Sequence, residues 1–194
     1  MLNKIKYFFK KKIRNHGKNN YIPHLPKGTR VIIDGDNNKI LIDPLLSAFN
    51  CKIKLGDSHN KTNSCTVKIG KDCTSNGLEI ILYEHNSYVS IGEDCMFSWR
   101  IRIFNTDAHS ILDKTTGKVL NVGKKINIGN HVWVGMDTLI LKNTVIPSNC
   151  VIGAHSVVNK KFTEENTVIA GHPAKVVKKC ITWDRRKAND FLTF

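Results

Sequence analysis

A histidine and a carboxylate lie two residues apart in the segment Asn105-Thr-Asp-Ala-His-Ser110. A neutral imidazole, whose unperturbed pKa is about 6.5, can accept a proton at pH 7 and so act as a general base. A neighbouring carboxylate or backbone carbonyl decides which ring nitrogen carries the proton, and Asp107 could do so. His109 is therefore the candidate base, with Asp107 as its partner, in a reaction that removes a proton from its substrate.

The chain that must position His109 repeats every six residues. Aliphatic residues recur six apart at Ile128, Val134, Ile140, Ile146, Ile152 and Val158. Four positions after each comes a second, mostly small residue: Val132, Thr138, Thr144, Cys150, Ser156 and Phe162. A helix repeats at 3.6 residues and a strand at 2, so a strict six predicts a solenoid in which each hexad forms a short strand and a corner. We expect both sets to point inward, and the glycines that follow three of the aliphatic residues (Gly129, Gly135 and Gly153) to relieve the corners.

His109 lies where this register fails. The count of six holds from Ile91 to Ala108, breaks at about 109–125, and resumes at Ile128. An insertion in a solenoid usually leaves one face as a loop, and binding faces collect such loops. The interruption therefore predicts an extended loop that makes His109 accessible to a substrate.

The 194 residues suit one domain. Short β-prone runs between polar corners continue the repeat, more loosely, over residues 29–90. We predict an all-β solenoid over residues 29–170, a basic segment at 1–28 that can include a helix, and a basic, irregular tail at 171–194.

The first twenty residues combine apolar and basic side chains. On a helix, one face would carry Leu2, Ile5, Phe9 and Ile13, and lysines and Arg14 would cover the rest. The lysines interrupt any apolar core that a signal peptide would need. Two interpretations remain open: a helix that caps the end of the solenoid, or an amphipathic helix lying on an anionic membrane surface.

The charge balance and the cysteines limit the partners and the compartment. Thirty Lys and Arg against sixteen Asp and Glu give a formal net charge of +14, which indicates polyanionic partners such as nucleic acid, anionic lipid, acidic glycan or a phosphate-rich ligand. The six cysteines form no Cys-x-x-Cys pair, and Cys73, Cys95 and Cys150 take small inward positions of their hexads. We therefore expect buried thiols, no metal site, and a reducing, cytoplasmic location.

Three segments identify a family resemblance: Ile128-Gly-Asn-His-Val-Trp-Val-Gly135, Val151-Ile-Gly-Ala-His-Ser-Val-Val158 and Ala170-Gly-His-Pro-Ala-Lys175. They resemble the hexapeptide-repeat acyltransferases, which are left-handed parallel β-helices that act as homotrimers on acetyl-CoA. Within that superfamily, the segment around His109, followed by a loop and His131-Val-Trp133, resembles sugar and polysaccharide O-acetyltransferases, including those of polysialic acid capsules. His109 precedes Trp133 by twenty-four positions, as the catalytic histidine of that group precedes its tryptophan.

The resemblance implies a role for each matching residue. Trp133 would join His109 in the catalytic site and line the acetyl and pantetheine channel. Pantetheine would run along Gly135, Met136 and Ala154. The nucleotide phosphates would meet Lys175 and Lys178, where many members have arginine.

An acceptor site could include Trp99, Arg100 and Asn105. Arg100 would engage a carboxylated sugar.

The expected function is acetyl transfer from acetyl-CoA to a hydroxyl of a bacterial surface glycan, a capsule or lipopolysaccharide sugar. The basic surface is consistent with an anionic glycan, and the enzyme could lie peripherally at the inner membrane. Alternatives are a small acceptor (a free sugar, serine, an antibiotic or a nucleotide-sugar amine) and a non-catalytic scaffold.

Two other function classes fit the sequence poorly. A γ-type carbonic anhydrase would need three zinc-binding histidines, and His131 has no partner histidine close in sequence. We expect no nucleic-acid partner, because the aromatic residues are not interleaved with the basic ones.

Overall fold

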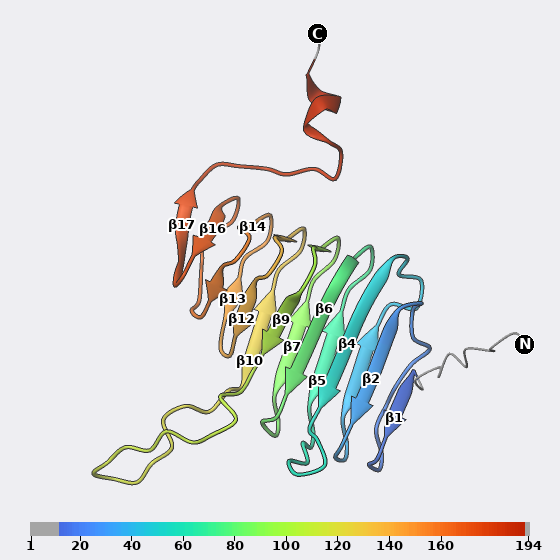
Figure 1. Cartoon of the computed structure of the whole chain (residues 1–194), viewed down its shortest axis with the longest axis vertical. Helices are drawn as coiled ribbons and strands as arrows, with labels where there is room; N and C mark the ends of the chain where they lie inside the picture. The colour runs from blue at the N-terminus through green and yellow to red at the C-terminus, as the bar shows by residue number, and fades with distance from the viewer. Residues whose placement is uncertain (1–11, 193–194) are drawn as a thin grey trace, which may run out of the picture.

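The computed structural model describes residues 12–192 and is built almost entirely of short strands (Figure 1). The strands are β1 (Ile13–Asn15), β2 (Thr29–Ile33), β3 (Lys39–Ile42), β4 (Phe49–Leu55), β5 (Thr66–Ile69), β6 (Thr74–Leu82), β7 (Tyr88–Ile91), β8 (Met96–Phe97), β9 (Ile101–Phe104), β10 (Lys125–Ile128), β11 (Trp133–Val134), β12 (Leu139–Leu141), β13 (Val145–Ile146), β14 (Val151–Ile152), β15 (Val157–Val158), β16 (Val168–Gly171) and β17 (Ala174–Lys178). One 3₁₀ turn, η1 (Ala188–Phe191), lies in the tail.

The strands form the predicted left-handed parallel β-helix, with three faces. Trp133 pairs with Val151, Leu139 with Val157 and Asn127 with Val145, so a regular coil takes 18 residues and contributes one strand to each face. The first face contains β8, β11, β14, β16 and β17, the second contains β1, β2, β9, β12 and β15, and the third contains β3, β5, β7, β10 and β13. The longer β4 and β6 turn the corner between the first and second faces, because β6 pairs with both β8 and β9.

The predicted inward residues are confirmed. All six aliphatic positions from Ile128 to Val158 are at most 3% exposed, and the six following positions from Val132 to Phe162 are all buried. Buried hydroxyls in these positions find backbone partners, as Thr138 Oγ1 donates to the Gly135 carbonyl at 2.7 Å. Cys73, Cys95 and Cys150 are buried free thiols, as expected. The interior is therefore a continuous column of side chains that fixes the position of every corner.

The chain turns these corners through left-handed residues that are not glycines. The left-handed residue of successive corners is His131, Asp137, Asn143, Asn149 and His155, with φ between 52° and 61°. Gly129, Gly135 and Gly153 are not among the left-handed residues, so they do not relieve the corners through left-handed backbone. Their role is clearance: a Cβ on Gly135 would lie 2.6 Å from the Ala154 nitrogen of the next coil. Short polar side chains tolerate the left-handed region well enough to hold the corner itself.

The solenoid begins earlier than residue 29. Ile13–Asn15 pair in parallel with Val31–Ile33, so β1 adds a strand to the second face. Ile13 therefore lies in a strand and not on the predicted helical face. The rest of that face, Leu2 to Phe9, lies outside the described residues, as does most of the segment proposed to contact lipid. Among residues 12–192, no helical segment has the length and apolar character that crossing a bilayer requires.

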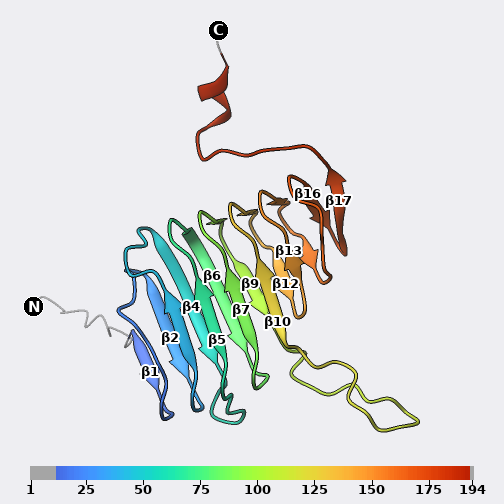
Figure 2. The same cartoon turned by 180° about the vertical axis from the view of Figure 1, so that it is seen from behind.

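The interruption of the register is the long arm that leaves the solenoid between β9 and β10 (Figure 2). It spans residues 105–124, a few residues more than the predicted 109–125 at its start. The arm folds back on itself: Leu112 and Val119 form an antiparallel bridge, and the Leu120 amide donates to the Ile111 carbonyl at 2.8 Å. At its tip, the Asp113 carboxylate accepts hydrogen bonds from the amides of Thr115 and Thr116. The arm is thus an ordered hairpin at the corner between the second and third faces.

The corner residue Asn149 provides a test of the left-handed requirement. Replacement by alanine should lower the free energy of unfolding by about 1 kcal/mol, because a β-carbon disfavours φ near +60°. Replacement by glycine should leave stability nearly unchanged, since glycine adopts this region freely. Urea unfolding followed by circular dichroism measures both. Equal stability of the alanine and glycine variants would contradict the assignment of this corner.

Candidate functional site

His109 lies at the base of the arm and is exposed to solvent. It lines a small pocket of about 150 Å³ together with Tyr83, Glu84, Ser110 and Asn121, among others. The chain before it is held firmly: the Thr106 hydroxyl donates to Glu84 Oε1 at 2.8 Å and accepts from the Ala108 amide at 2.9 Å. Ala108 takes a left-handed conformation, with φ of 63°. This turn presents His109, exposed to solvent, at the edge of the solenoid beside the pocket.

Asp107 is engaged by residues other than His109. Its Oδ2 forms an ion pair with Lys142 Nζ and accepts a hydrogen bond from Asn121 Nδ2 at 2.8 Å. No hydrogen bond joins Asp107 to the His109 ring within the described residues. In the isolated chain Asp107 therefore ties the arm to β12 and its corner, and does not orient the imidazole as the sequence suggested.

Asn121 holds the two sides of the arm together. Its Nδ2 donates to the His109 carbonyl at 2.8 Å as well as to Asp107, and its Oδ1 accepts from the Ile111 amide at 2.8 Å. The sequence reasoning missed this residue, because an asparagine in a polar loop carries no signal of its partners. It closes a polar network around the backbone of His109.

Trp133 lies on a different face of the solenoid from the arm that carries His109. It belongs to β11 on the first face, between Met96 and Val151, and its side chain is 39% exposed. His109 leaves from the corner between the second and third faces, which lies across the coil from the first face. One chain alone therefore does not bring His109 and Trp133 together.

The other residues matched to the donor lie along the first face and its corner with the second. Ala154 and the exposed Met136 occupy equivalent positions in stacked coils, and Gly135 lies close against the Ala154 backbone. Lys175 and Lys178 lie on β17, which pairs antiparallel with β16 at the end of the same sheet. β17 is three strands from β11, about 14 Å at ordinary strand spacing. These residues form one surface that runs from Trp133 to the last strand.

The residues proposed for the acceptor separate into two environments. Trp99, 54% exposed, and Arg100 line a groove of about 480 Å³ at the corner between the first and second faces, with Lys52 and Arg102. Arg100 is not free to grip a carboxylate, because its guanidinium already binds Asp137 through two hydrogen bonds of 2.5 and 2.6 Å. Those bonds hold the pKa of Asp137 below its usual value.

Asn105, the first residue of the arm, is fully buried, and its Oδ1 accepts a hydrogen bond from the Tyr83 amide at 3.3 Å. Its Nδ2 has no hydrogen-bond partner among the described residues. The basic residues that the sequence reasoning missed in the groove are Lys52, paired with Glu79 at 2.6 Å, and the exposed Arg102.

Comparison with known proteins places this chain among transferases. The profile of the family described as bacterial transferase hexapeptide (six repeats) matches residues 125–160. The polysialic acid O-acetyltransferase OatWY is 35% identical, with a TM-score of 0.70 over 92% of this chain and 96% of its own. The polySia-specific acetyltransferase NeuO is 26% identical, with a TM-score of 0.72 over 91% and 83% of the two chains.

A curated relative is an uncharacterized 24.8 kDa protein in the cps region of Klebsiella pneumoniae. It is 50% identical over 101 residues, which cover 50% of this chain and 42% of that protein. The match thus covers less than half of the relative's length.

Replacing Asn121 by alanine should loosen the arm without unfolding the solenoid. The change removes three hydrogen bonds at the base of the arm, each worth about 1 kcal/mol, so amide hydrogen exchange over residues 109–121 should accelerate at least tenfold. Thr116→Ala, which alters only the tip, is the matched control and should leave exchange near His109 unchanged. Unaltered exchange in the Asn121 variant would contradict the proposed network.

Proposed function

This chain belongs to the hexapeptide-repeat acyltransferases, and from that premise we propose that it transfers an acetyl group from acetyl-CoA to a hydroxyl of a bacterial surface glycan. The observation that carries the proposal is the 35% identity with a polysialic acid O-acetyltransferase over nearly the full length of both chains. The likeness covers 92% of this chain and so extends well beyond the family profile at residues 125–160.

His109 is the proposed general base. Its neutral imidazole takes the proton from the acceptor hydroxyl as the oxygen attacks the thioester carbonyl. The tetrahedral intermediate then collapses, the carbon–sulfur bond breaks, and the imidazolium returns the proton to the CoA thiolate. The exposure of His109 and the rigid turn at Thr106–Ala108 support this role, because a base must meet its substrate at hydrogen-bonding distance.

The first face is the proposed donor surface. Trp133 offers an exposed aromatic surface to the acetyl and pantetheine groups, and the small, exposed Ala154 leaves room beside the coil where Gly135 lies buried beneath it. Lys175 and Lys178 on β17 supply positive charge for the phosphates at the far end. Lysine is a point charge and cannot form arginine's two-pronged contact, so each lysine contributes less than the arginine found in many members.

The proposed acceptor surface is the groove at the corner between the first and second faces. Trp99 provides an aromatic platform for a sugar ring, and Arg102 and Lys52 provide positive charge on the second face. This surface suits an anionic glycan. The relative from a capsule (cps) region and the two polysialic acid enzymes support a capsular acceptor over a small molecule.

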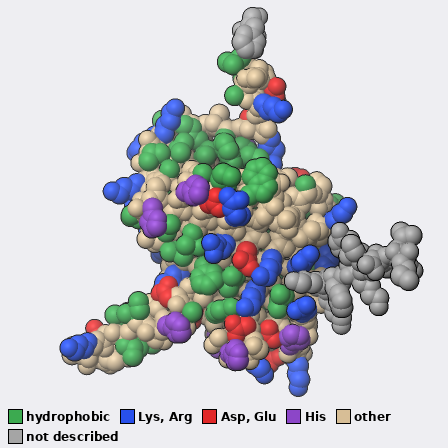
Figure 3. Space-filling model, in the orientation of Figure 1, with side chains coloured by type: hydrophobic (Ala, Val, Ile, Leu, Met, Phe, Trp, Pro, Cys, Tyr) green, Lys and Arg blue, Asp and Glu red, His purple; other side chains and the backbone are tan. Residues whose placement is uncertain are grey.

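We further propose that the active enzyme is a homotrimer in which His109 of one chain meets Trp133 of a neighbour. Within one chain the two residues lie across the coil from each other. The arm also exposes a run of apolar side chains that a monomer leaves in water: Ile111, Leu112, Val119, Leu120 and Val122. Figure 3 shows such hydrophobic side chains along the projecting arm. A cyclic trimer would bury this arm and complete three equivalent sites.

His109→Ala should lower turnover by about 10³-fold while the chain stays folded, because the general base is lost. The assay uses acetyl-CoA with a panel of anionic and neutral bacterial glycans, and mass spectrometry detects the transferred acetyl group. His24→Ala, an exposed histidine in the N-terminal coil that does not line the His109 pocket, is the control and should keep full activity.

A loss below tenfold in the His109 variant would remove it as the base. Failure of the wild-type chain to bind CoA in isothermal titration would favour a non-catalytic scaffold.

Light scattering should give a trimer for the wild-type chain. Leu120→Asp places a charge on the apolar side of the arm, where the side chain is 63% exposed in one chain. We expect this variant to be monomeric and inactive, with an unchanged circular dichroism spectrum, because the charge cannot be buried between subunits. A monomer that retains turnover would overturn the shared site.

A further inference from the structure

The segment after β17 forms a strap, residues 181–185, along the corner between the third and first faces. In Figure 1 the tail leaves β17 and crosses above the coils. The Ile181 amide donates to the Asn166 carbonyl at 3.0 Å, Trp183 contacts His131, and Arg185 reaches Asp94 and Asp72. The strap thus runs back over successive coils, from the C-terminal coils toward the N-terminal ones.

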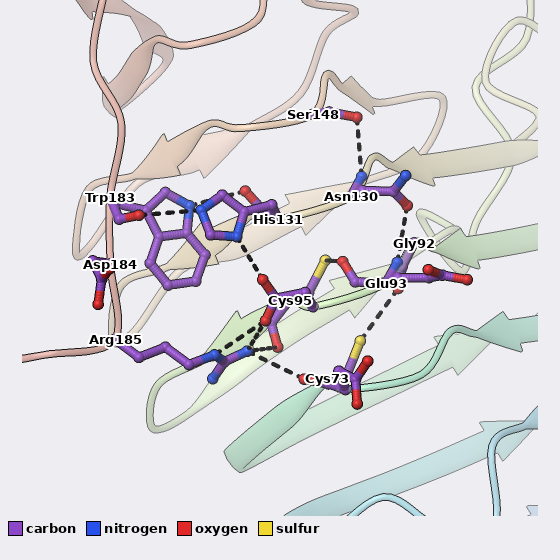
Figure 4. Close-up of polar contacts among 12 residues, drawn as sticks. Cys73, Gly92, Glu93, Cys95, Asn130, His131, Ser148, Trp183, Asp184 and Arg185 are labelled. Carbon is purple, nitrogen blue, oxygen red and sulfur yellow. Dashed lines mark hydrogen bonds and ion pairs between the residues drawn. The ribbon is translucent and has the colours of Figure 1, made fainter.

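Trp183 and His131 are joined by three contacts (Figure 4). Their rings stack with centroids 4.1 Å apart and an angle of 11°. Trp183 Nε1 donates to the His131 carbonyl at 2.9 Å, and His131 Nε2 lies 3.1 Å from the Trp183 carbonyl. His131 Nδ1 lies 2.7 Å from Asp94 Oδ2. Trp183 is only 8% exposed, so this ring is a packed element of the corner, although it comes from the tail.

Arg185 anchors the end of the strap. Its guanidinium donates to Asp94 Oδ1 at 2.8 Å, to Thr74 Oγ1 at 2.8 Å and to the Asp72 carbonyl at 3.2 Å. Asp94 therefore binds the strap through Arg185 and the stacked histidine through its other oxygen. Partial burial raises the pKa of Asp94, but hydrogen bonds from Arg185 and His131 outweigh this and leave it below the usual value. The carboxylate is thus ionised at neutral pH, as an anchor for Arg185 must be.

The strap also reaches the proposed donor surface. The Trp183 ring lies 6.2 Å from that of Trp133, centroid to centroid, at 47°. This is a favourable separation for a tilted aromatic pair. Trp133 comes two residues after His131, so the strap contacts both the corner before Trp133 and the Trp133 ring itself.

We propose that Trp183 is a positioning residue for the acyl donor: the strap clamps it on His131 so that it fixes the orientation of the Trp133 ring. This inference rests on the proposed function of Trp133 and assigns a role in donor binding to a segment that lies outside the six-residue repeat. Trp183 does not touch the reacting atoms. Its effect is on donor binding, which its loss should weaken while the chemical step proceeds at nearly the same rate.

The aromatic contact can be tested without any ligand. The chain has three tryptophans, Trp99, Trp133 and Trp183. A tilted pair at 6.2 Å should give an exciton couplet in circular dichroism. Trp183→Phe and Trp133→Phe should each remove the couplet, and Trp99→Phe, which is not in the pair, should keep it. A couplet that survives Trp183→Phe would overturn the contact.

The role in donor binding needs a second experiment. Trp183→Ala should raise the Kd for CoA, measured by calorimetry, and the KM for acetyl-CoA about tenfold, with kcat within threefold of wild type. Trp183→Phe should recover part of the affinity, because it keeps an aromatic ring. Arg185→Gln keeps Trp183 but weakens the anchor, and it should therefore also raise the Kd for CoA and the KM for acetyl-CoA. Arg186→Ala is the control and should bind CoA like wild type, since among the described residues Arg186 pairs with Asp184 and packs on Phe191, and contacts neither Trp183 nor Asp94.

The outcomes separate this inference from the proposed function. If wild type binds CoA and folded Trp183→Ala binds it equally well, the strap is only structural and the inference is overturned. A fall in kcat with an unchanged KM would overturn it as well. If wild type does not bind CoA, the proposed function fails, and this inference fails with it. The exciton couplet would then still show whether Trp183 contacts Trp133.

Discussion

The stacking of 18-residue coils at strand spacing is the constraint on which the rest of the structure depends. Each coil must match the next in backbone hydrogen bonds on three faces and in side-chain volume along the axis. A Cβ on Gly135 would meet the nitrogen of Ala154 at 2.6 Å, which shows how little space remains between coils. Because the interior is filled and the faces are paired, variation is left to the corners and to segments that leave the stack.

The three corners accordingly differ from one another. The corner between the second and third faces releases the arm, whose base holds His109 within a network of Asp107, Asn121 and Lys142. The corner between the first and second faces carries the groove with Trp99 and Arg102. The corner between the third and first faces is covered by the strap, through Trp183 and Arg185. The same solenoid thus presents three chemically distinct edges without any change to its core.

How far the sequence predicts these features depends on the range of the interactions that produce them. The inward positions from Ile128 to Val158 follow from a local period and are confirmed. The arm was expected because the period breaks, but its start was placed at 109, because the count of six was extended to Ala108, whereas the last strand before the arm ends at Phe104. The way in which Gly135 relieves its corner could not be predicted, because clearance between coils depends on a residue nineteen positions away.

Polar partners were the least predictable. Asp107 lies close to His109 in sequence, yet its ion pair is with Lys142, thirty-five residues further along. Arg185 reaches Asp94 and Asp72 across 91 and 113 residues, and no periodicity relates the tail to those corners. Such contacts arise because one corner stacks residues from distant hexads into a single row, so a short segment crossing it meets several parts of the sequence at once.

The same geometry explains why a site can be divided among chains. A triangular coil keeps its three edges apart, and the filled interior leaves no cavity in which groups from two edges could meet. In the proposed trimer, a second copy supplies one of the two residues His109 and Trp133, which one chain carries on an edge and on the face across from it. Arms that leave an edge and expose apolar side chains, as Leu112 and Leu120 do, are therefore suited to join neighbouring copies. In such an assembly the rigidity of the stack becomes an advantage, because each chain presents its half of the site in a fixed position.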